Sequence, residues 1–138
     1  MATDTLHAFR NVPLLQGLDD RHLRRLANAA KERRYREGDV LASEGAEHGS
    51  RFFFVIGEGN ATVSRGGQEL ATLGPGDYFG EMALIDEGAR SATVVAATDM
   101  LTYTLTPWEF RPFVEENPDI AWSLLRTLTE RLRSAESR

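Results

Sequence analysis

The sequence contains no cysteine, which excludes disulfide bonds and every metal site that depends on a thiolate ligand. It also has no apolar run long enough to cross a bilayer, and its first residues lack the basic and apolar regions of a secretory signal. Its three histidines, His7, His22 and His48, are widely separated and form no paired motif, so a metal-dependent barrel enzyme is not expected. These absences predict a cytoplasmic protein with neither a membrane segment nor a metal cofactor.

An excess of basic residues is absent as well. The chain has 16 Lys and Arg against 21 Asp and Glu, a net charge of −5, which argues against direct binding to DNA. Its basic cluster, Lys31–Arg36, is interpreted as the solvated C-terminal end of a helix, with a docking patch as the alternative. No Ser/His/Asp arrangement, P-loop or Rossmann glycine pattern is found in its required context, so the protein is not expected to be an enzyme.

The length of 138 residues fits a single domain, residues 1–138, that opens with a helical part over residues 1–32. The segment Leu14–Leu18 leads into Asp19 and Asp20, which form a plausible helix N-cap. Apolar residues at helical spacing follow it, namely Leu23, Leu26, Ala27 and Ala30.

Residues 33–106 read instead as short strands separated by glycine-rich turns. Their close spacing predicts an antiparallel β-roll or jelly-roll barrel, so the fold class is mainly β with flanking helices. Gly66-Gly67 has the composition of a hairpin turn. The predicted strands are Val40–Ala42, Phe52–Ile56, Ala61–Val63, Leu70–Leu73, Thr93–Ala96 and Leu101–Leu105.

Helices are predicted again over residues 107–138. Thr106 is a cap with Pro107 at the first helical position, and Asn117-Pro118-Asp119 opens a last helix to about Ser134. Trp108 and Trp122 are interpreted as core or interface aromatics. The apolar stripe of the last helix consists of Ala121, Leu124, Leu125, Leu128 and Leu132.

The segment Phe79–Leu84 stands out within this β-rich region. A glycine beside a carboxylate begins about one turn of good helix formers, and a helix start presents unpaired backbone N–H groups that favour an anion. Nine residues after Glu81 comes Arg90, followed by the small residues Ser91 and Ala92. Small neighbours allow a planar guanidinium to approach a phosphate with two hydrogen bonds.

The pattern Gly80-Glu81-Met82-Ala83-Leu84 followed by Arg90-Ser91-Ala92-Thr93 resembles the phosphate-binding cassette of cyclic-nucleotide-binding domains. This family includes the catabolite activator proteins and the regulatory subunits of cyclic-AMP-dependent protein kinase. The resemblance extends to the glycine turns around the strands, including Gly57-Glu58-Gly59 and Gly74-Pro75-Gly76-Asp77. It places the cassette at residues 79–93.

The resemblance implies a role for each cassette residue. Arg90 would neutralise the cyclic phosphate with help from backbone N–H groups of the cassette and the Ser91 hydroxyl. Glu81 would accept a hydrogen bond from the ribose 2′-OH, and the Gly80 backbone would lie against the sugar. The last helix would pack on the base and respond to binding. The implied ligand-binding residues are Gly80, Glu81, Met82, Ala83, Arg90, Ser91 and Ala92, and the candidate lid residues are Leu125, Leu128, Thr129 and Leu132.

The resemblance therefore predicts a sensor that binds cyclic AMP, or alternatively cyclic GMP, and acts on an unidentified protein effector. It is expected to be either free-standing or excised from a larger protein. Two other interpretations remain open at this stage. Glu81 and Arg90 could form an internal ion pair with no ligand, and the chain could be an interaction module that dimerises through its C-terminal helix.

Overall fold

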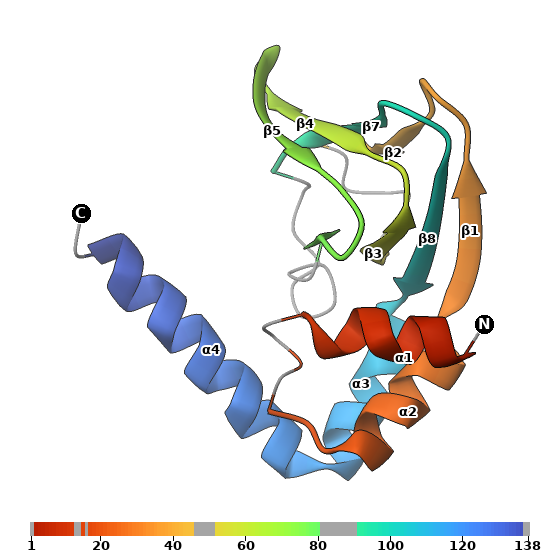
Figure 1. Cartoon of the computed structure of the whole chain (residues 1–138). Helices are drawn as coiled ribbons and strands as arrows, with labels where there is room; N and C mark the ends of the chain where they lie inside the picture. The colour runs from red at the N-terminus through yellow and green to blue at the C-terminus, as the bar shows by residue number, and fades with distance from the viewer. Residues whose placement is uncertain (1, 13–14, 16, 46–51, 81–90, 137–138) are drawn as a thin grey trace.

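The computed structural model describes residues 2–12, 15, 17–45, 52–80 and 91–136 (Figure 1). It contains the roll and the flanking helices that the sequence predicts. The helices are α1 (Ala2–Arg10), α2 (Asp20–Ala29), α3 (Pro107–Glu116) and α4 (Pro118–Glu136). The strands are β1 (Lys31–Tyr35), β2 (Val40–Ala42), β3 (Phe53–Glu58), β4 (Ala61–Arg65), β5 (Gln68–Leu73), β6 (Tyr78–Phe79), β7 (Thr93–Ala96) and β8 (Met100–Leu105).

The strands form two antiparallel four-stranded sheets, in the orders β1-β8-β3-β6 and β2-β7-β4-β5. Both glycines of the predicted hairpin turn, Gly66 and Gly67, have positive φ and connect β4 to β5. Gly59 also has a positive φ, and a side chain there would collide with the carbonyl oxygen of Asp99. The turn after β3 is thereby held close to the turn before β8.

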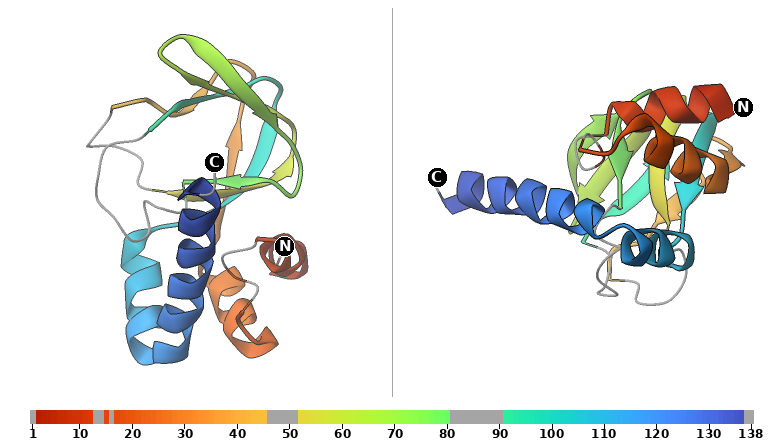
Figure 2. Two further views of the ribbon diagram at one scale, coloured as in Figure 1. Left: turned by 90° about the vertical axis from the view of Figure 1, so that its left-hand side faces the viewer. Right: turned by 90° about the horizontal axis from the view of Figure 1, so that it is seen from below.

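Alternate residues of β3 divide the core into two clusters, because successive side chains of a strand point to opposite faces. Phe53 and Val55 face the helices, where they pack with residues of α1, α2, α3 and α4. Phe54 and Ile56 face the interior of the roll and pack against the second sheet. All four side chains are fully buried. The helices therefore cover one face of the β1-β8-β3-β6 sheet, and the roll encloses the other face (Figure 2).

The predicted start of α2 is confirmed in atomic detail. The side chain of Asp19 accepts a hydrogen bond from the His22 backbone N–H at 2.9 Å, and Leu23, Leu26 and Ala27 are buried. Ala30 follows the helix as its C-cap. The hydrogen bond from His22 favours the ionised carboxylate and lowers the pKa of Asp19 from its usual value of 3.8.

The Asp19→Asn variant, which has a neutral cap in place of this carboxylate, is expected to lose less stability in acid than the wild type does. Since the folded pKa lies below the unfolded one, the contribution of the charge is complete above the usual pKa and is lost as the pH falls through the lowered value. The advantage of the wild type over the variant in melting temperature should therefore shrink as the pH falls below about 4. Thermal melts followed by circular dichroism would measure it. The exposed Glu69→Gln serves as the control, and a gap for Asp19→Asn that stays constant through acid pH would contradict the expectation.

The basic segment Lys31–Arg36 corrects one prediction, because it is not the end of a helix. Residues Lys31–Tyr35 form β1, which pairs with β8 from Lys31↔Thr104 to Tyr35↔Met100 at the edge of its sheet. Four of its five residues are exposed, so the strand lacks the alternation of apolar and polar residues that marks a half-buried strand. Charged side chains on an edge strand also disfavour pairing with another chain.

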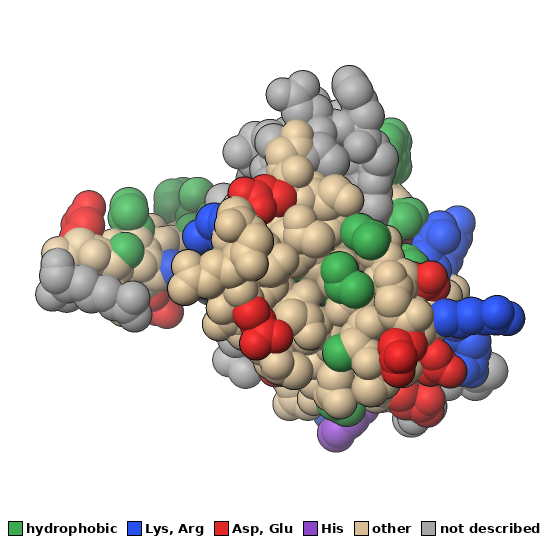
Figure 3. Space-filling model, turned by 90° about the horizontal axis from the view of Figure 1, so that it is seen from above, with side chains coloured by type: hydrophobic (Ala, Val, Ile, Leu, Met, Phe, Trp, Pro, Cys, Tyr) green, Lys and Arg blue, Asp and Glu red, His purple; other side chains and the backbone are tan. Residues whose placement is uncertain are grey.

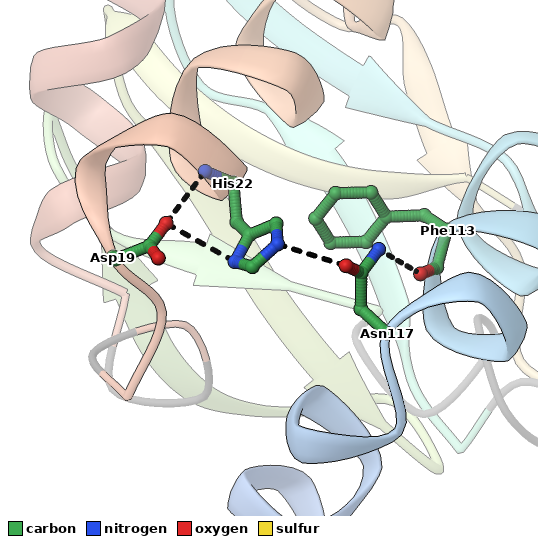
Figure 4. A network of polar contacts seen from close by, with 4 residues as sticks. All are labelled: Asp19, His22, Phe113 and Asn117. Atoms are coloured by element: carbon green, nitrogen blue, oxygen red, sulfur yellow. Dashed lines mark hydrogen bonds and ion pairs between the residues drawn. The ribbon is translucent and has the colours of Figure 1, made fainter.

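A polar network joins α2 to the junction of α3 and α4 (Figure 4). His22 contacts Asp19 Oδ1 through Nδ1 at 3.1 Å and Asn117 Oδ1 through Nε2 at 2.9 Å. The amide of Asn117 donates in turn to the Phe113 carbonyl oxygen at 2.9 Å, and the His22 ring lies edge-on to the Phe113 ring. The network fixes the residue between the two C-terminal helices, and α4 starts from this anchored position.

Both C-terminal helices begin where the sequence predicts. Thr106 and Glu109 form a reciprocal capping box at the start of α3, with Pro107 in the first turn. Helix α4 begins at Pro118 and buries Ile120, Ser123 and Leu124 in its first turns. Its C-terminal end extends away from the roll (Figures 1 and 2).

Candidate functional site

The described residues frame the predicted cassette from both sides. Gly80 lies at its beginning, and Ser91 and Ala92 lie at its end, directly before β7. The structure therefore places three of the predicted ligand-binding residues. The other four, Glu81, Met82, Ala83 and Arg90, lie outside the described residues.

The entrance to the cassette is set by two aromatic residues and a glycine. Phe79, the last residue of β6, stacks on Phe54 with ring centroids 4.6 Å apart and an interplanar angle of 13°. Gly80 follows with φ of 81°, in the left-handed region that residues with a side chain rarely adopt. The chain therefore leaves the roll interior at a position that favours glycine, as the cassette pattern requires.

The exit of the cassette is tied to two neighbouring turns. The Arg65 side chain donates its Nε–H to the Ser91 carbonyl oxygen at 2.8 Å. The Glu44 backbone N–H donates to Thr93 Oγ1 at 3.0 Å, and the Glu44 carboxylate accepts the Gly66 backbone N–H at 2.9 Å. The sequence analysis missed both Arg65 and Glu44, because nothing in the spacing of residues indicates which turns meet in space.

The roll interior behind these two ends is apolar. The buried hydrophobic side chains there form one cluster that includes Phe54, and a second set of partly buried side chains packs against this cluster. Burial raises the pKa of the Tyr35 hydroxyl, which favours its neutral form. At Phe52 the Arg33 guanidinium lies over the ring, 4.3 Å from its centroid. The partly buried set consists of Tyr35, Phe52, Val63, Leu73 and Phe79.

A groove of about 590 Å³ lies elsewhere on the molecule. Residues of β1, β3 and β8 line it, together with α1 and the residue after it and the turn that precedes β6. Its described lining includes His7, Glu32 and Arg34 and does not include the described cassette residues Gly80, Ser91 and Ala92. The groove therefore does not involve the two described ends of the cassette.

The candidate lid residues lie in the middle and the second half of α4, and most of them face solvent. Leu125 and Leu132 are 52% and 60% exposed, and Leu128 is partly buried. Thr129 is exposed and donates its hydroxyl to the Leu125 carbonyl oxygen at 2.7 Å. The apolar stripe that the sequence predicts is therefore buried at Leu124, partly buried at Leu128, and exposed at Leu125 and Leu132. Figure 3 shows hydrophobic side chains on the projecting helix.

One polar contact joins this part of α4 to the cassette entrance. The Arg131 guanidinium donates to the Tyr78 hydroxyl at 2.6 Å. Tyr78 packs edge-on against Phe53 and lies in β6, two residues before Gly80. The sequence analysis did not select Arg131 or Tyr78, because they belong to elements that no sequence pattern links.

Of the two alternatives for the tryptophans, core or interface aromatics, the structure excludes the core and leaves the interface as a prediction. Trp108 and Trp122 are 68% and 64% exposed, so neither belongs to the core of this chain.

Among the described residues, no group of three or more His, Asp or Glu side chains is arranged to hold a metal ion. Within the same part of the chain, no helix combines the length and the apolar character needed to span a bilayer.

Comparison with known proteins decides the family. Residues 32–117 match the cyclic nucleotide-binding domain, a region that runs from β1 through the cassette to the end of α3. The chain belongs to this family. The sequence resemblance and the predicted mainly β architecture with flanking helices are both confirmed.

Three relatives show how the domain is used in other proteins. A cyclic nucleotide-gated potassium channel of Mesorhizobium japonicum is 39% identical over 91% of this chain and 34% of its own length. The cyclic AMP receptor protein of Thermus thermophilus is 33% identical over 90% of this chain and 59% of its own length. The N-terminal domain of a transcriptional regulator from Streptomyces coelicolor superimposes with a TM-score of 0.83 at 30% identity, covering 94% and 95% of the two chains. This chain thus spans about a third to three fifths of these two longer relatives.

Proposed function

We propose that this cyclic nucleotide-binding domain is a sensor that binds cyclic AMP in the cassette at residues 79–93 and signals through α4. In this proposal Arg90 neutralises the cyclic phosphate, and the Glu81 carboxylate accepts the ribose 2′-OH. The role of the domain is to bind and regulate, and no catalytic step is assigned to it. The observation that carries the proposal is the family match, which spans the whole cassette.

The described ends of the cassette support the phosphate part of the proposal. Gly80 leaves β6 with a positive φ, which allows its backbone to lie close to a sugar without interference from a side chain. Ser91 is exposed at the other end, so its hydroxyl and the backbone around it are accessible to a ligand. A negatively charged phosphate would be held by Arg90, by the N–H groups of Ala83, Ser91 and Ala92, and by the Ser91 hydroxyl.

The identity of the base is a separate part of the proposal. The Ser91 hydroxyl could bind a guanine and would then favour cyclic GMP. We propose cyclic AMP as the ligand, in line with the similarity to the cyclic AMP receptor protein of Thermus thermophilus. The partly buried apolar side chains within the roll, such as Val63 and Leu73, would lie against a flat purine.

Helix α4 supplies the output in this proposal. Its first turns are buried, and the Asn117 network anchors its start, but Leu125 and Leu132 remain exposed. Movement of the second half would therefore break few apolar contacts. A ligand shifts such a helix only if it binds more tightly with the helix in one position than in the other. Arg131 and Tyr78 connect this half of α4 to the strand that enters the cassette.

We expect Tyr78→Phe to loosen the second half of α4, because it removes the hydroxyl that accepts from Arg131. A single such hydrogen bond corresponds to about a two- to tenfold change in local opening. Hydrogen exchange of the backbone amides over residues 127–134 would measure it in the nucleotide-free protein. The control is Tyr103→Phe, a tyrosine change on β8, which should leave these amides unchanged. Unaltered exchange in Tyr78→Phe would show that this contact does not hold the helix.

Calorimetric titration of the purified protein with cyclic AMP and cyclic GMP tests the proposed function. The protein must first be freed of nucleotide carried through purification, since a filled pocket would imitate a negative result. Binding at micromolar concentration or tighter, about −8 kcal/mol, supports a sensor, and the tighter ligand identifies the base. No heat with either nucleotide, in folded and nucleotide-free protein, would rule the proposal out.

A second candidate function is an interaction module that has kept the fold without the ligand. The exposed apolar side chains of Trp122, Leu125 and Leu132 favour it, because such residues on one helix mark a surface for a partner or a second copy. Light scattering on the same samples would separate the two functions. A dimer that binds neither nucleotide would favour the interaction module.

A further inference from the structure

Arg65 lies at the end of β4, far from the cassette in the sequence but in contact with it in space. Its side chain is exposed, and its Nε–H donates to the carbonyl oxygen of Ser91 at 2.8 Å. Ser91 directly follows Arg90, the residue proposed to neutralise the phosphate. The contact therefore acts on the backbone at the end of the proposed phosphate site.

The geometry of a peptide unit turns this contact into a constraint on the ligand side. A trans peptide is planar, so its C=O and the following N–H point in opposite directions, and the described chain contains no cis peptide. Holding the Ser91 carbonyl toward Arg65 directs the Ala92 N–H away from Arg65. A cationic donor on the carbonyl also polarises the peptide and strengthens that N–H as a donor.

The neighbouring turns keep Arg65 in place. The next residue, Gly66, donates its backbone N–H to the Glu44 carboxylate, and the Glu44 backbone N–H donates to Thr93 Oγ1. The hairpin tip, the turn after β2 and the start of β7 are thus joined around the Ser91–Ala92 peptide. Arg65 is held at both the backbone and the side-chain end.

We propose that Arg65 is a positioning residue for the nucleotide phosphate, and that it acts by aiming the Ala92 N–H through its hydrogen bond to the Ser91 carbonyl oxygen. It does not itself touch the ligand in this proposal. The inference rests on the proposed function, because the phosphate that it positions is that of the cyclic nucleotide. It assigns an effect on affinity to a residue that the cassette pattern does not include.

The test is the affinity of Arg65→Met for cyclic AMP, measured by calorimetry beside the wild type. Methionine keeps an unbranched apolar stem and removes every donor. The matched control is Arg34→Met, which removes the same charge from an exposed position on β1. Each protein is titrated at low and at high salt, because screening weakens a long-range charge effect and leaves a local hydrogen-bond effect in place.

We expect Arg65→Met to bind about tenfold more weakly at both salt concentrations, and Arg34→Met to bind like the wild type. We also expect the Ala92 amide resonance to shift in the nucleotide-free Arg65→Met protein, since the peptide is no longer polarised. If Arg65→Met shows the wild-type affinity, or if its loss disappears at high salt, the positioning role is overturned and the proposed function stands. If the wild type binds no cyclic nucleotide, the proposed function fails and the inference fails with it.

Discussion

Replacing Arg90 by alanine is expected to lower the affinity for cyclic AMP by about 100- to 4,000-fold. The reason is that the proposed site holds a phosphate away from bulk water, and Arg90 is the cation assigned to it. Removing one partner of such a pair costs about 3–5 kcal/mol, because the other charge is left without compensation. Each 1.4 kcal/mol corresponds to about tenfold in affinity. Calorimetry at several nucleotide concentrations would resolve a loss of this size.

The comparison with Glu81→Ala makes the result specific. A hydrogen bond to an ionised group contributes about 1.5–3 kcal/mol, so this variant should lose less affinity than Arg90→Ala. It should also lose most of its preference for the ribose over the 2′-deoxyribose form of the nucleotide. An Arg90→Ala protein that binds as tightly as the wild type would mean that Arg90 does not bind the phosphate, and would favour the internal ion pair with Glu81.

Replacing Phe54 by alanine is expected to lower the free energy of unfolding by about 3–5 kcal/mol. Phe54 is fully buried in the roll interior, stacks on Phe79, and lies within 6.1 Å of the Tyr35 ring and 5.9 Å of the Phe52 ring, measured between centroids. A cavity there would remove the Phe54 ring from its contacts with three aromatic rings. The loss is a large part of the 5–15 kcal/mol that stabilises a typical domain. Urea denaturation followed by circular dichroism would measure it.

Trp108→Ala is the control for Phe54→Ala. It removes more atoms, but the side chain is 68% exposed, so its expected effect is about 0.5 kcal/mol or less. If Phe54→Ala does not fold at all, Phe54→Leu is expected to fold with a smaller loss of about 1 kcal/mol. Equal stabilities of Phe54→Ala and Trp108→Ala would contradict the packing described for the roll interior.

The strands could be predicted because their local signals agree with the fold. Short apolar runs such as Leu101–Leu105 end at turn residues, and Gly66-Gly67 marks a hairpin in which both glycines have positive φ. The helix caps at Asp19 and Thr106 were equally local, since each depends on a hydrogen bond to a residue three positions away. Features that are specified within a few residues were therefore found.

Features that depend on distant pairing were missed. The residues of β1 are mostly charged, and the strand exists because β8 pairs with it along its whole length. Helix α1 lies within the helical part predicted over residues 1–32, but its bounds were not predicted, although its buried residues Thr5, Ala8 and Phe9 have helical spacing. The two-residue strand β6 is too short for any periodicity to indicate it.

The candidate site shows the same division. The cassette motif and the conformation of Gly80 follow from local sequence, whereas the contacts of Arg65 and Arg131 join segments that the fold brings together. The stripe on α4 could not be resolved from sequence, because apolar residues at helical spacing look alike whether they face a core or solvent. Leu124 and Leu125 are adjacent, yet one is buried and the other is 52% exposed.

The pairing of β1 with β8 also has a consequence for synthesis on the ribosome. Lys31 pairs with Thr104, so β1 emerges 73 residues before its partner. At about 5–20 residues per second, this separation corresponds to roughly 4–15 s without a partner strand. The charged side chains of Lys31–Tyr35 are well suited to this interval, because a nascent edge strand of this composition resists pairing with other chains. The roll is therefore expected to close only after residues 100–105 have been synthesised.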